Sequence, residues 1–145
     1  ESQAKEHRTF DIQNVMEDHS MSGHGAMTES SDTMRHMINM QEYDANRIDA
    51  LIKSGAIEMW TFDNTKGEEP HPMHLHGVQF QILSRTGGRN TLTPLESGWK
   101  DTALVLPGET VKIIIPFGNT LGKFVFHCHN LEHEDTGMMG QFQIN

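Results

Sequence analysis

The feature that most limits what this chain can fold into is a series of short segments in which apolar and polar residues alternate. In one of them, every second residue is a branched aliphatic one, at Val111, Ile113 and Ile115. Side chains of a β-strand point alternately to its two faces, so this pattern predicts a strand with one buried face. Turn signals such as Gly87-Gly88 and Pro107-Gly108 separate the segments. About seven or eight such strands predict an all-β fold, a sandwich or a barrel.

A single domain over residues 1–145 accounts for the chain, because this length is usual for one domain. We predict a short helical turn between Asp44 and Ser54, ended by Gly55. Strands are predicted over residues 8–13, 36–40, 57–62, 78–83, 102–106, 111–115, 124–127 and 141–144.

The charge balance narrows the possible partners. The sequence holds 11 Lys and Arg against 20 Asp and Glu, a formal net charge of -9. A nucleic-acid-binding domain needs a basic face, so we expect no nucleic-acid partner. No run of about 18 apolar residues occurs, so we expect no membrane span. The single Cys cannot form an internal disulfide.

Residues 16–36 differ from the rest of the chain. Between residues 16 and 40, Met occurs six times and His three times among Ser, Gly, Asp and Glu, without a clear period. We predict an exposed Met- and His-rich loop over 16–36. It is either a solvated connection or a soft-ligand segment that holds Cu(I) transiently, since thioether and imidazole groups suit that ion.

Two short blocks hold six of the ten histidines: residues 71–77 (HPMHLHG) and residues 127–133 (HCHNLEH). On a strand, Cys128 points to one face, and His127 and His129 point to the other. The tripeptide can therefore serve two metal sites on opposite sides of a sheet.

One of these sites has the donors of a blue-copper centre, namely a Cys thiolate, two imidazoles and a weak axial thioether. Cys128, His133 and Met138 lie close together in the sequence, and His71 is the natural source of the second imidazole. Zinc is the alternative metal, but a structural zinc site leaves Met138 and the surplus histidines unexplained.

The surplus histidines indicate further copper. His74 and His76 share a face of an extended chain, and with His127 and His129 they make four imidazoles. One blue copper does not need these four groups. They imply additional copper ions near Cys128, connected to it through the backbone of the tripeptide.

Both blocks resemble the C-terminal cupredoxin domain of the three-domain multicopper oxidases, the laccase and cuprous-oxidase family. The motifs are His-Pro-x-His-x-His-Gly over 71–77 and His-Cys-His-x3-His-x4-Met over 127–138, and the stretch 131–139 is most similar to the bacterial branch. The resemblance implies a Greek-key cupredoxin fold and a copper-dependent oxidase that is active only with its N-terminal domains. It implies these ligand roles: His71, Cys128 and His133 for type 1 copper with Met138 axial, His74 for type 2 copper, and His76, His127 and His129 for the type 3 pair.

The resemblance also implies a path for electrons and protons. A phenolic, aromatic or Cu(I) donor would reduce type 1 copper through the edge of His71 or His133. Cys128 would pass the electrons to a trinuclear cluster that reduces O2 to water. Glu134 matches the acidic residue that relays protons in related oxidases, and it is equally compatible with a surface carboxylate. Asp101 is a candidate for orienting one of the imidazoles.

The chain supplies only half of the trinuclear cluster. The family takes the other half from an N-terminal domain, as two His-x-His pairs, and no such pair occurs among the remaining histidines: His7, His19, His24 and His36. We therefore expect the N-terminal cupredoxin domains of the same oxidase as partner, in a separate chain or in a missing part of this one. The start at Glu1 fits a cut in an interdomain linker.

Three other functions explain less of the sequence. A stand-alone blue-copper electron carrier needs none of the surplus histidines, and a copper nitrite reductase lacks the type 3 pair. Copper sequestration by the Met-rich segment leaves both motifs unexplained. Glu68 and Glu69, just before His71, either attract a cationic donor or form a solvated turn. The family is mostly exported, so the resemblance implies an extracytoplasmic location, periplasmic or secreted.

Overall fold

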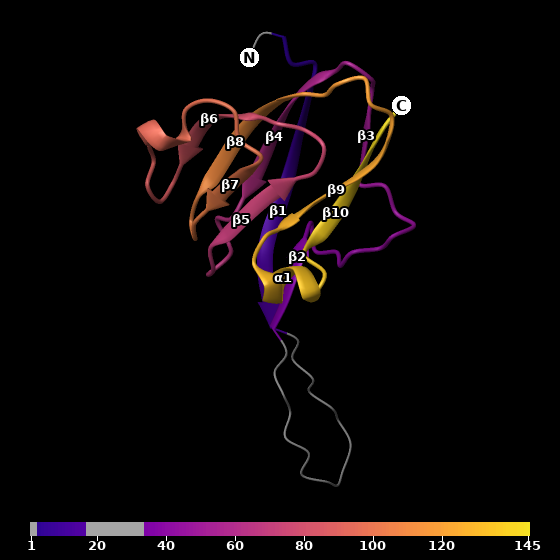
Figure 1. The fold of residues 1–145 in the computed structure, drawn as a ribbon. Helices are drawn as coiled ribbons and strands as arrows, with labels where there is room; N and C mark the ends of the chain where they lie inside the picture. The colour runs from indigo at the N-terminus through magenta and orange to yellow at the C-terminus, as the bar shows by residue number, and fades with distance from the viewer. Residues whose placement is uncertain (1–2, 17–33) are drawn as a thin grey trace, which may run out of the picture.

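The structure, a computed structural model, describes residues 3–16 and 34–145, which form two five-stranded β-sheets packed face to face (Figure 1). The elements follow in this order: β1 (Glu6–Met16), β2 (Met34–Ile38), β3 (Ala50–Ile52), β4 (Ile57–Asp63), β5 (His71–Leu75), β6 (Gln81–Thr86), η1 (Pro94–Glu96), β7 (Thr102–Val105), β8 (Thr110–Pro116), β9 (Gly122–Cys128), α1 (Leu131–Asp135) and β10 (Met139–Ile144).

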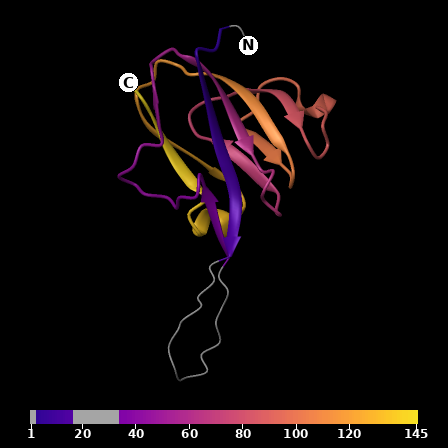
Figure 2. The ribbon, with the colours of Figure 1, turned by 180° about the vertical axis from the view of Figure 1, so that it is seen from behind.

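The strand order is β2-β1-β4-β8-β6 in the first sheet and β3-β10-β9-β5-β7 in the second. The pairs β1–β4 and β3–β10 are parallel, and the other paired strands of the described chain are antiparallel. Figure 2 shows β1 running along the back of the molecule, beside β2 and β4. The arrangement confirms the predicted all-β fold and shows that it is a sandwich rather than a barrel. It places α1 at the end of the sandwich where β1 ends (Figure 1).

Aromatic side chains fill the space between the sheets. Trp60 of β4 is fully buried, and its ring centroid lies 4.8 Å from that of Phe10 and 5.3 Å from that of Phe126. Phe142 meets Trp60 edge-on at 5.7 Å. Such pairs stabilise by about 0.5–1.5 kcal/mol each beyond the area they bury. Because Phe10 and Trp60 come from one sheet and Phe126 and Phe142 from the other, these contacts hold the two sheets together.

A buried carboxylate accompanies this aromatic core. Glu58 is 1% exposed and accepts hydrogen bonds from Trp60 Nε1 at 2.9 Å and from Arg8 Nε at 2.8 Å. Arg8 Nη2 donates to the other carboxylate oxygen at 3.1 Å, and this bonding to Glu58 raises the pKa of Arg8. The Glu58 charge is therefore compensated inside the sandwich, where an unpaired carboxylate would be strongly destabilising.

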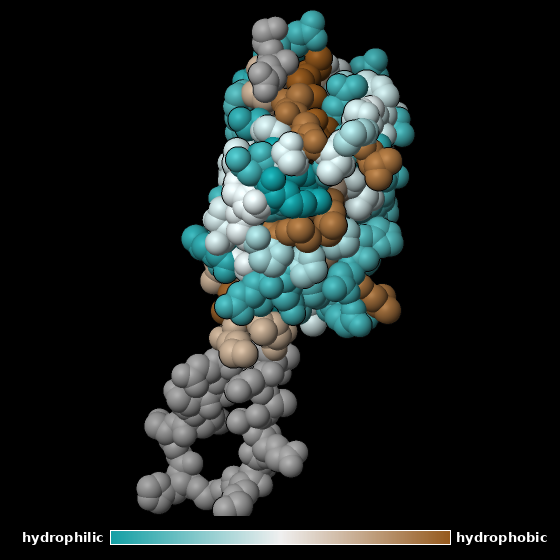
Figure 3. Space-filling model, turned by 90° about the vertical axis from the view of Figure 1, so that its left-hand side faces the viewer, coloured by the Kyte–Doolittle hydropathy of each residue, from teal (hydrophilic) through white to brown (hydrophobic). Residues whose placement is uncertain are grey.

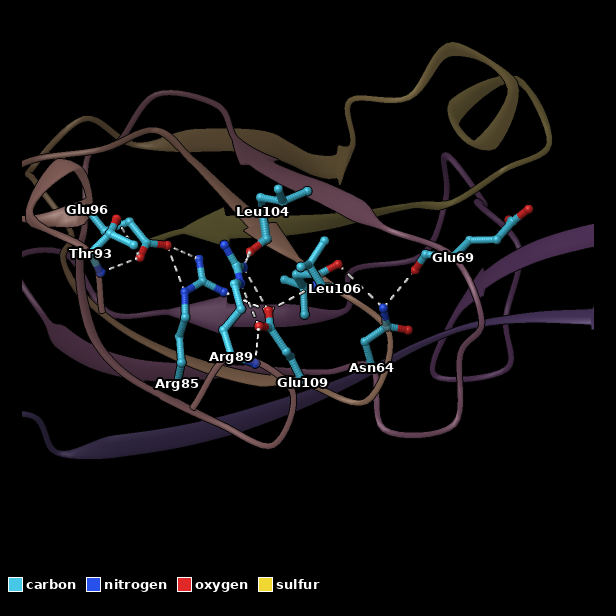
Figure 4. Close-up of polar contacts among 10 residues, drawn as sticks. Asn64, Glu69, Arg85, Arg89, Thr93, Glu96, Leu104, Leu106 and Glu109 are labelled. Atoms are coloured by element: carbon cyan, nitrogen blue, oxygen red, sulfur yellow. Dashed lines mark hydrogen bonds and ion pairs between the residues drawn. The ribbon is translucent and has the colours of Figure 1, made fainter. Parts of the chain in front are cut away.

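A second buried carboxylate organises the loops around β6 and β8. Glu109 is fully buried and accepts hydrogen bonds from Arg85 Nη1 at 3.0 Å, Arg89 Nε at 2.6 Å and the Leu106 backbone N–H at 3.0 Å (Figure 4). Arg85 is paired with Glu96 as well. The Arg89 hydrogen bond is the largest cause that lowers the pKa of Glu109 to about 2, and the backbone N–H of Leu106 adds to it.

Asn64 fixes the chain just before β5. It is fully buried, and its Nδ2 donates to the backbone oxygen of Glu69 at 2.8 Å and to that of Val105 at 3.4 Å (Figure 4). Val105 of β7 lies opposite His71 of β5, so Asn64 ties the start of β5 to its neighbour. A side chain at Gly67 would meet Asn64 Oδ1 at 1.9 Å, which explains the glycine.

The helical turn predicted for Asp44–Ser54 is wrong. That segment contains β3, in which Ala50 and Ile52 are buried and Leu51 is exposed. Pairing with β10 decides the conformation, because β3 lies parallel to residues 142–144 and its two buried side chains join the core. The helical turns of the described chain lie elsewhere, at η1 and α1.

The predicted exposed loop over 16–36 is wrong at its two ends. Met16 belongs to β1, and it lies opposite Met34 of β2. His36 is only 6% exposed, because it shares the inner face of β2 with the core residue Ile38. Residues 17–33 lie outside the described residues, so Cu(I) binding there stays a prediction.

The outer surface is mixed in character. Figure 3 shows one side of the molecule, on which hydrophobic residues form patches separated by hydrophilic ones. Leu95 and Leu131 are among the most exposed large apolar side chains, at 86% and 68%. Within the described ranges, no helix is both long and apolar enough to cross a membrane.

We predict that the Glu109→Gln variant loses about 3 kcal/mol of unfolding free energy at neutral pH, because it removes the charge opposite the fully buried Arg85 side chain. The pKa of Glu109 is depressed, so its contribution is present above about pH 4.5 and is lost as the pH falls toward 2. Denaturant titrations across this range should show the two stabilities converging in acid. Glu132→Gln, at an exposed carboxylate, is the control. A constant difference down to low pH would contradict the prediction.

Candidate metal centre

Three side chains with ligand atoms converge at the α1 end of the sandwich. Cys128 Sγ lies 3.7 Å from His71 Nδ1 and 3.5 Å from His133 Nδ1, and the two Nδ1 atoms are 3.1 Å apart. All three residues are buried. We call them the inner cluster. They are the three strong ligands that the sequence motifs assign to type 1 copper.

Alternation along two paired strands produces this convergence. His71 on β5 and Cys128 on β9 both lie on the buried face of their strands, and Met73, two residues after His71, is the register partner of Cys128. His133 follows on α1. Met138 is fully buried, and its backbone oxygen accepts the Cys128 N–H at 3.1 Å. The expected axial residue therefore lies next to Cys128.

Burial sets the protonation of the inner cluster. It lowers the pKa of His71 to about 4, with His133 adding to the effect, and it also lowers the pKa of His133. Burial raises the pKa of Cys128 to about 11. At neutral pH both imidazoles are uncharged and able to bind a metal ion, whereas the thiol keeps its proton until a metal displaces it.

The other histidines of the two blocks gather on the opposite face of the second sheet. His76 Nε2 and His127 Nε2 are 3.0 Å apart, and the His74 ring centroid is 4.8 Å from that of His76. The His129 ring lies 5.5 Å from those of His74 and His127. We call these four residues the outer cluster. His76 and His129 are exposed, and a pocket of about 640 Å³ beside them is lined in part by His74, His76 and Trp99.

The backbone orients one histidine of the outer cluster. His74 Nδ1 lies 2.9 Å from the Asp101 carbonyl oxygen and 3.1 Å from Thr102 Oγ1. A carbonyl oxygen only accepts hydrogen bonds, so Nδ1 carries the proton and Nε2 is available to a metal. Asp101, the candidate orienting residue, thus acts through its backbone. Its carboxylate accepts a hydrogen bond from Thr102 Oγ1. Thr102 is a residue of this site that the sequence analysis did not identify.

Glu134 lies beside the outer cluster. Its Oε2 is 3.3 Å from His127 Nδ1, and its side chain is 36% exposed. The carboxylate therefore touches both solvent and a histidine of the expected trinuclear site. This position is compatible with proton transfer, which stays a prediction.

Sequence reasoning missed how two residues surround His133. His36 of β2 stacks on the His133 ring, with a centroid separation of 3.7 Å and an interplanar angle of 15°. Glu69 Oε2 lies 2.7 Å from His36 Nε2 and 3.2 Å from His133 Nε2. His36 belongs to no motif, and only the pairing of β2 with β1 places it on the inner face. The one sequence signal for its role is that a polar residue stands on the otherwise apolar face of β2.

The donor sets fit copper. The inner cluster offers a soft thiolate and two imidazoles with a methionine next to Cys128, and the outer cluster offers imidazoles alone. Copper accepts both sets, whereas the all-sulfur or closed four-ligand sites of structural zinc are absent from the described residues. The β-sandwich with these two clusters defines a copper protein of the cupredoxin type.

Comparison with known proteins places the chain within that class. The multicopper oxidase family matches residues 5–145. The chain is 44% identical over 111 residues to a multicopper oxidase of Staphylococcus haemolyticus, covering 74% of this chain and 24% of that protein. It is 41% identical over 99 residues to the bilirubin oxidase of Albifimbria verrucaria, covering 67% and 17%. The solved structure of a Campylobacter jejuni multicopper oxidase has a TM-score of 0.78 at 32% identity, covering 97% of this chain and 30% of that one.

The chain therefore belongs to the multicopper oxidase family, as the two motifs predicted. The structural match extends over nearly all of the sandwich and confirms the expected cupredoxin fold. The chain spans about a quarter of the length of the curated relatives it matches.

We predict that Cys128 resists alkylation in the folded, metal-free chain. Its pKa of about 11 and its complete burial leave little accessible thiolate at mildly alkaline pH. Labelling by iodoacetamide, followed by mass spectrometry, should be at least roughly 100-fold slower than in denaturant at the same pH. Glutathione serves as the reactive control in both solutions. Equal rates for the folded and unfolded chain would contradict a buried, protonated thiol.

Proposed function

We propose that this chain is the electron-accepting domain of a multicopper oxidase. Its inner cluster takes electrons from a donor, and its outer cluster is half of the site that reduces O2 to water. The observation that supports this proposal most directly is the tripeptide His-Cys-His at the end of β9. Its Cys128 faces the inner cluster and its His127 faces the outer one. Copper, when bound, supplies one-electron oxidation of the donor and four-electron reduction of O2.

The residues divide between the two faces of the second sheet. In the inner cluster, His71, Cys128 and His133 would hold type 1 copper, and the buried Met138 would offer a weaker thioether ligand. The outer ligands would be His74 for type 2 copper and His76, His127 and His129 for the type 3 pair. The peptide link between Cys128 and His127 then gives electrons a short covalent route.

The exposure of the outer cluster supports a partner domain. His76 and His129 are exposed, and His76 lines the 640 Å³ pocket. A trinuclear site needs more imidazoles than the four that this chain offers. The chain spans about a quarter of its curated relatives, which leaves room in those proteins for further domains. The N-terminal cupredoxin domains of the same oxidase, carrying two His-x-His pairs, would cover this face.

Glu134 is the proposed proton relay to the outer cluster. Reduction of O2 to water consumes one proton for each electron, so protons must reach a site that the partner domain shields from water. A carboxylate between solvent and His127, at 3.3 Å from the ring nitrogen, can accept a proton from one side and release it on the other.

Two observations suggest the class of electron donor: the descriptions of similar proteins and the burial of the inner cluster. Similar proteins are described as laccases, a bilirubin oxidase and a metallo-oxidase, so phenolic, aromatic and Cu(I) donors are the candidate classes. His71 and His133 are both nearly inaccessible to solvent, at 0% and 5% exposure. A donor would therefore approach through the groups that cover them, among which Glu69 is partly exposed. The expected location is extracytoplasmic.

A stand-alone electron carrier is the second candidate, and the outer cluster argues against it. An electron carrier uses the inner cluster alone and has no need of four further histidines, two of which, His74 and His76, line an open pocket. The exposed imidazoles of His76 and His129 have no role in such a carrier.

The deciding experiment loads the 145-residue chain with Cu(II) and measures bound copper, EPR, the visible spectrum and oxygen uptake. We expect one type 1 signal with an intense thiolate-to-copper band and no oxygen uptake by the chain alone. Cys128→Ser should abolish the band. His76→Gln is the matched control, because it alters only the exposed outer cluster and should leave the band intact.

Oxygen uptake that appears on mixing with the N-terminal domains would support the proposal that the outer cluster is half of the trinuclear site. Four coppers per chain with turnover would contradict a half-site and require a second copy of the chain to supply the missing ligands. Absence of the thiolate-to-copper band in the wild-type chain would contradict the type 1 assignment itself.

A further inference from the structure

A second layer of side chains surrounds the one ligand of the inner cluster that comes from a helix. His36 on β2 and Glu69, in the loop between β4 and β5, meet at His133 on α1. The His36 ring lies flat on the His133 ring, 3.7 Å away between centroids, and His36 is 6% exposed. A histidine pair stacked in this way blocks rotation of the His133 imidazole.

Glu69 connects the two rings through a single oxygen. Its Oε2 lies 2.7 Å from His36 Nε2 and 3.2 Å from His133 Nε2. This geometry makes Glu69 the acceptor at both rings, because a carboxylate has no proton to donate. Asn64 holds the Glu69 backbone in turn, and His36 Nδ1 is held by Thr136 Oγ1 at 3.1 Å.

This contact selects one tautomer of His133. Because Glu69 accepts at Nε2, the His133 proton sits on Nε2 and the lone pair sits on Nδ1, the atom that faces Cys128 Sγ at 3.5 Å. The Asn130 side-chain amide also lies 3.2 Å from His133 Nε2. An amide can present its oxygen or its NH2 group at that position, so it adapts to whichever tautomer the carboxylate imposes.

We propose that Glu69, held by His36, is the positioning residue that prepares His133 to bind metal and sets the reduction potential of the inner cluster. The part of this proposal that concerns the copper potential rests on the proposed function, and the part that concerns the His133 tautomer does not. A carboxylate that accepts a hydrogen bond from a ligating imidazole makes the imidazole a stronger donor. The stronger donor favours Cu(II) over Cu(I), so Glu69 holds the potential down.

The first test needs no metal. Nitrogen NMR of the apo chain, labelled at histidine, reports which ring nitrogen of His133 carries the proton. We expect the proton on Nε2 in the wild-type chain and a mixture of tautomers in Glu69→Gln, whose neutral amide can also donate to that nitrogen. A wild-type His133 with its proton on Nδ1 would overturn the proposal, and this readout stands whether or not copper binds.

The second test measures the reduction potential of the copper-loaded chain. Glu69→Gln should weaken Cu(II) binding about ten-fold relative to Cu(I), which for one electron raises the potential by about 59 mV. Glu68→Gln is the matched control, because it removes the same charge one position away, and the Glu68 carboxylate has no ion-pair partner among the described residues. An equal shift in the two variants would overturn the proposal, because the effect would then be that of net charge.

His36→Phe separates the stacked ring from the hydrogen bond. Phe preserves a flat ring against His133 but cannot donate to Glu69, so we expect a shift in the same direction as Glu69→Gln and smaller. A shift in His36→Phe with none in Glu69→Gln would overturn the role of the carboxylate. If the wild-type chain shows no type 1 band, the proposed function fails, whereas the tautomer of His133 still decides the positioning role.

Discussion

Both histidine clusters depend on the antiparallel pairing of β5 with β9. Met73 lies opposite Cys128 and His74 lies opposite His127, so one ladder brings two distant motifs into register. The strict alternation of side chains then sends His71 and Cys128 to the core and His74 and His127 to the outer face. A slip of one residue in this ladder would exchange the faces and separate every ligand from its partners. The chemistry of the site is therefore a property of strand register.

Packing on each side of this ladder keeps that register. Phe126 joins the aromatic core below it, and the Pro72 oxygen accepts the His129 N–H at 2.7 Å just past the end of β9. Gly77, the last residue of the first motif, has a φ of +74°, and a side chain there would meet the Phe124 ring at 2.6 Å. The glycine of that motif is thus explained by backbone conformation and by close packing at the same time.

The two motifs and the longer strands could be predicted from sequence because their information is local. Alternation at Val111, Ile113 and Ile115 is enough to identify β8. By contrast, β3 has only three residues, and its conformation is set by β10, which no local pattern reveals. The same holds for His36 and Thr102, which reach the clusters only through the way their strands pair. Local sequence identified the candidate ligands, and tertiary pairing places the groups that contact them.

The order of the candidate ligands along the chain limits when the inner cluster can form during synthesis. His71 and Cys128 are 57 positions apart, and β9 acquires its second neighbour only with β10, after Met138. Pairings over such separations form late, once the intervening chain is available. A copper ion that meets the growing chain on the ribosome encounters scattered Met and His side chains and no buried cluster. The inner cluster is therefore complete only in the finished fold, so we expect copper to bind the folded domain rather than the growing chain.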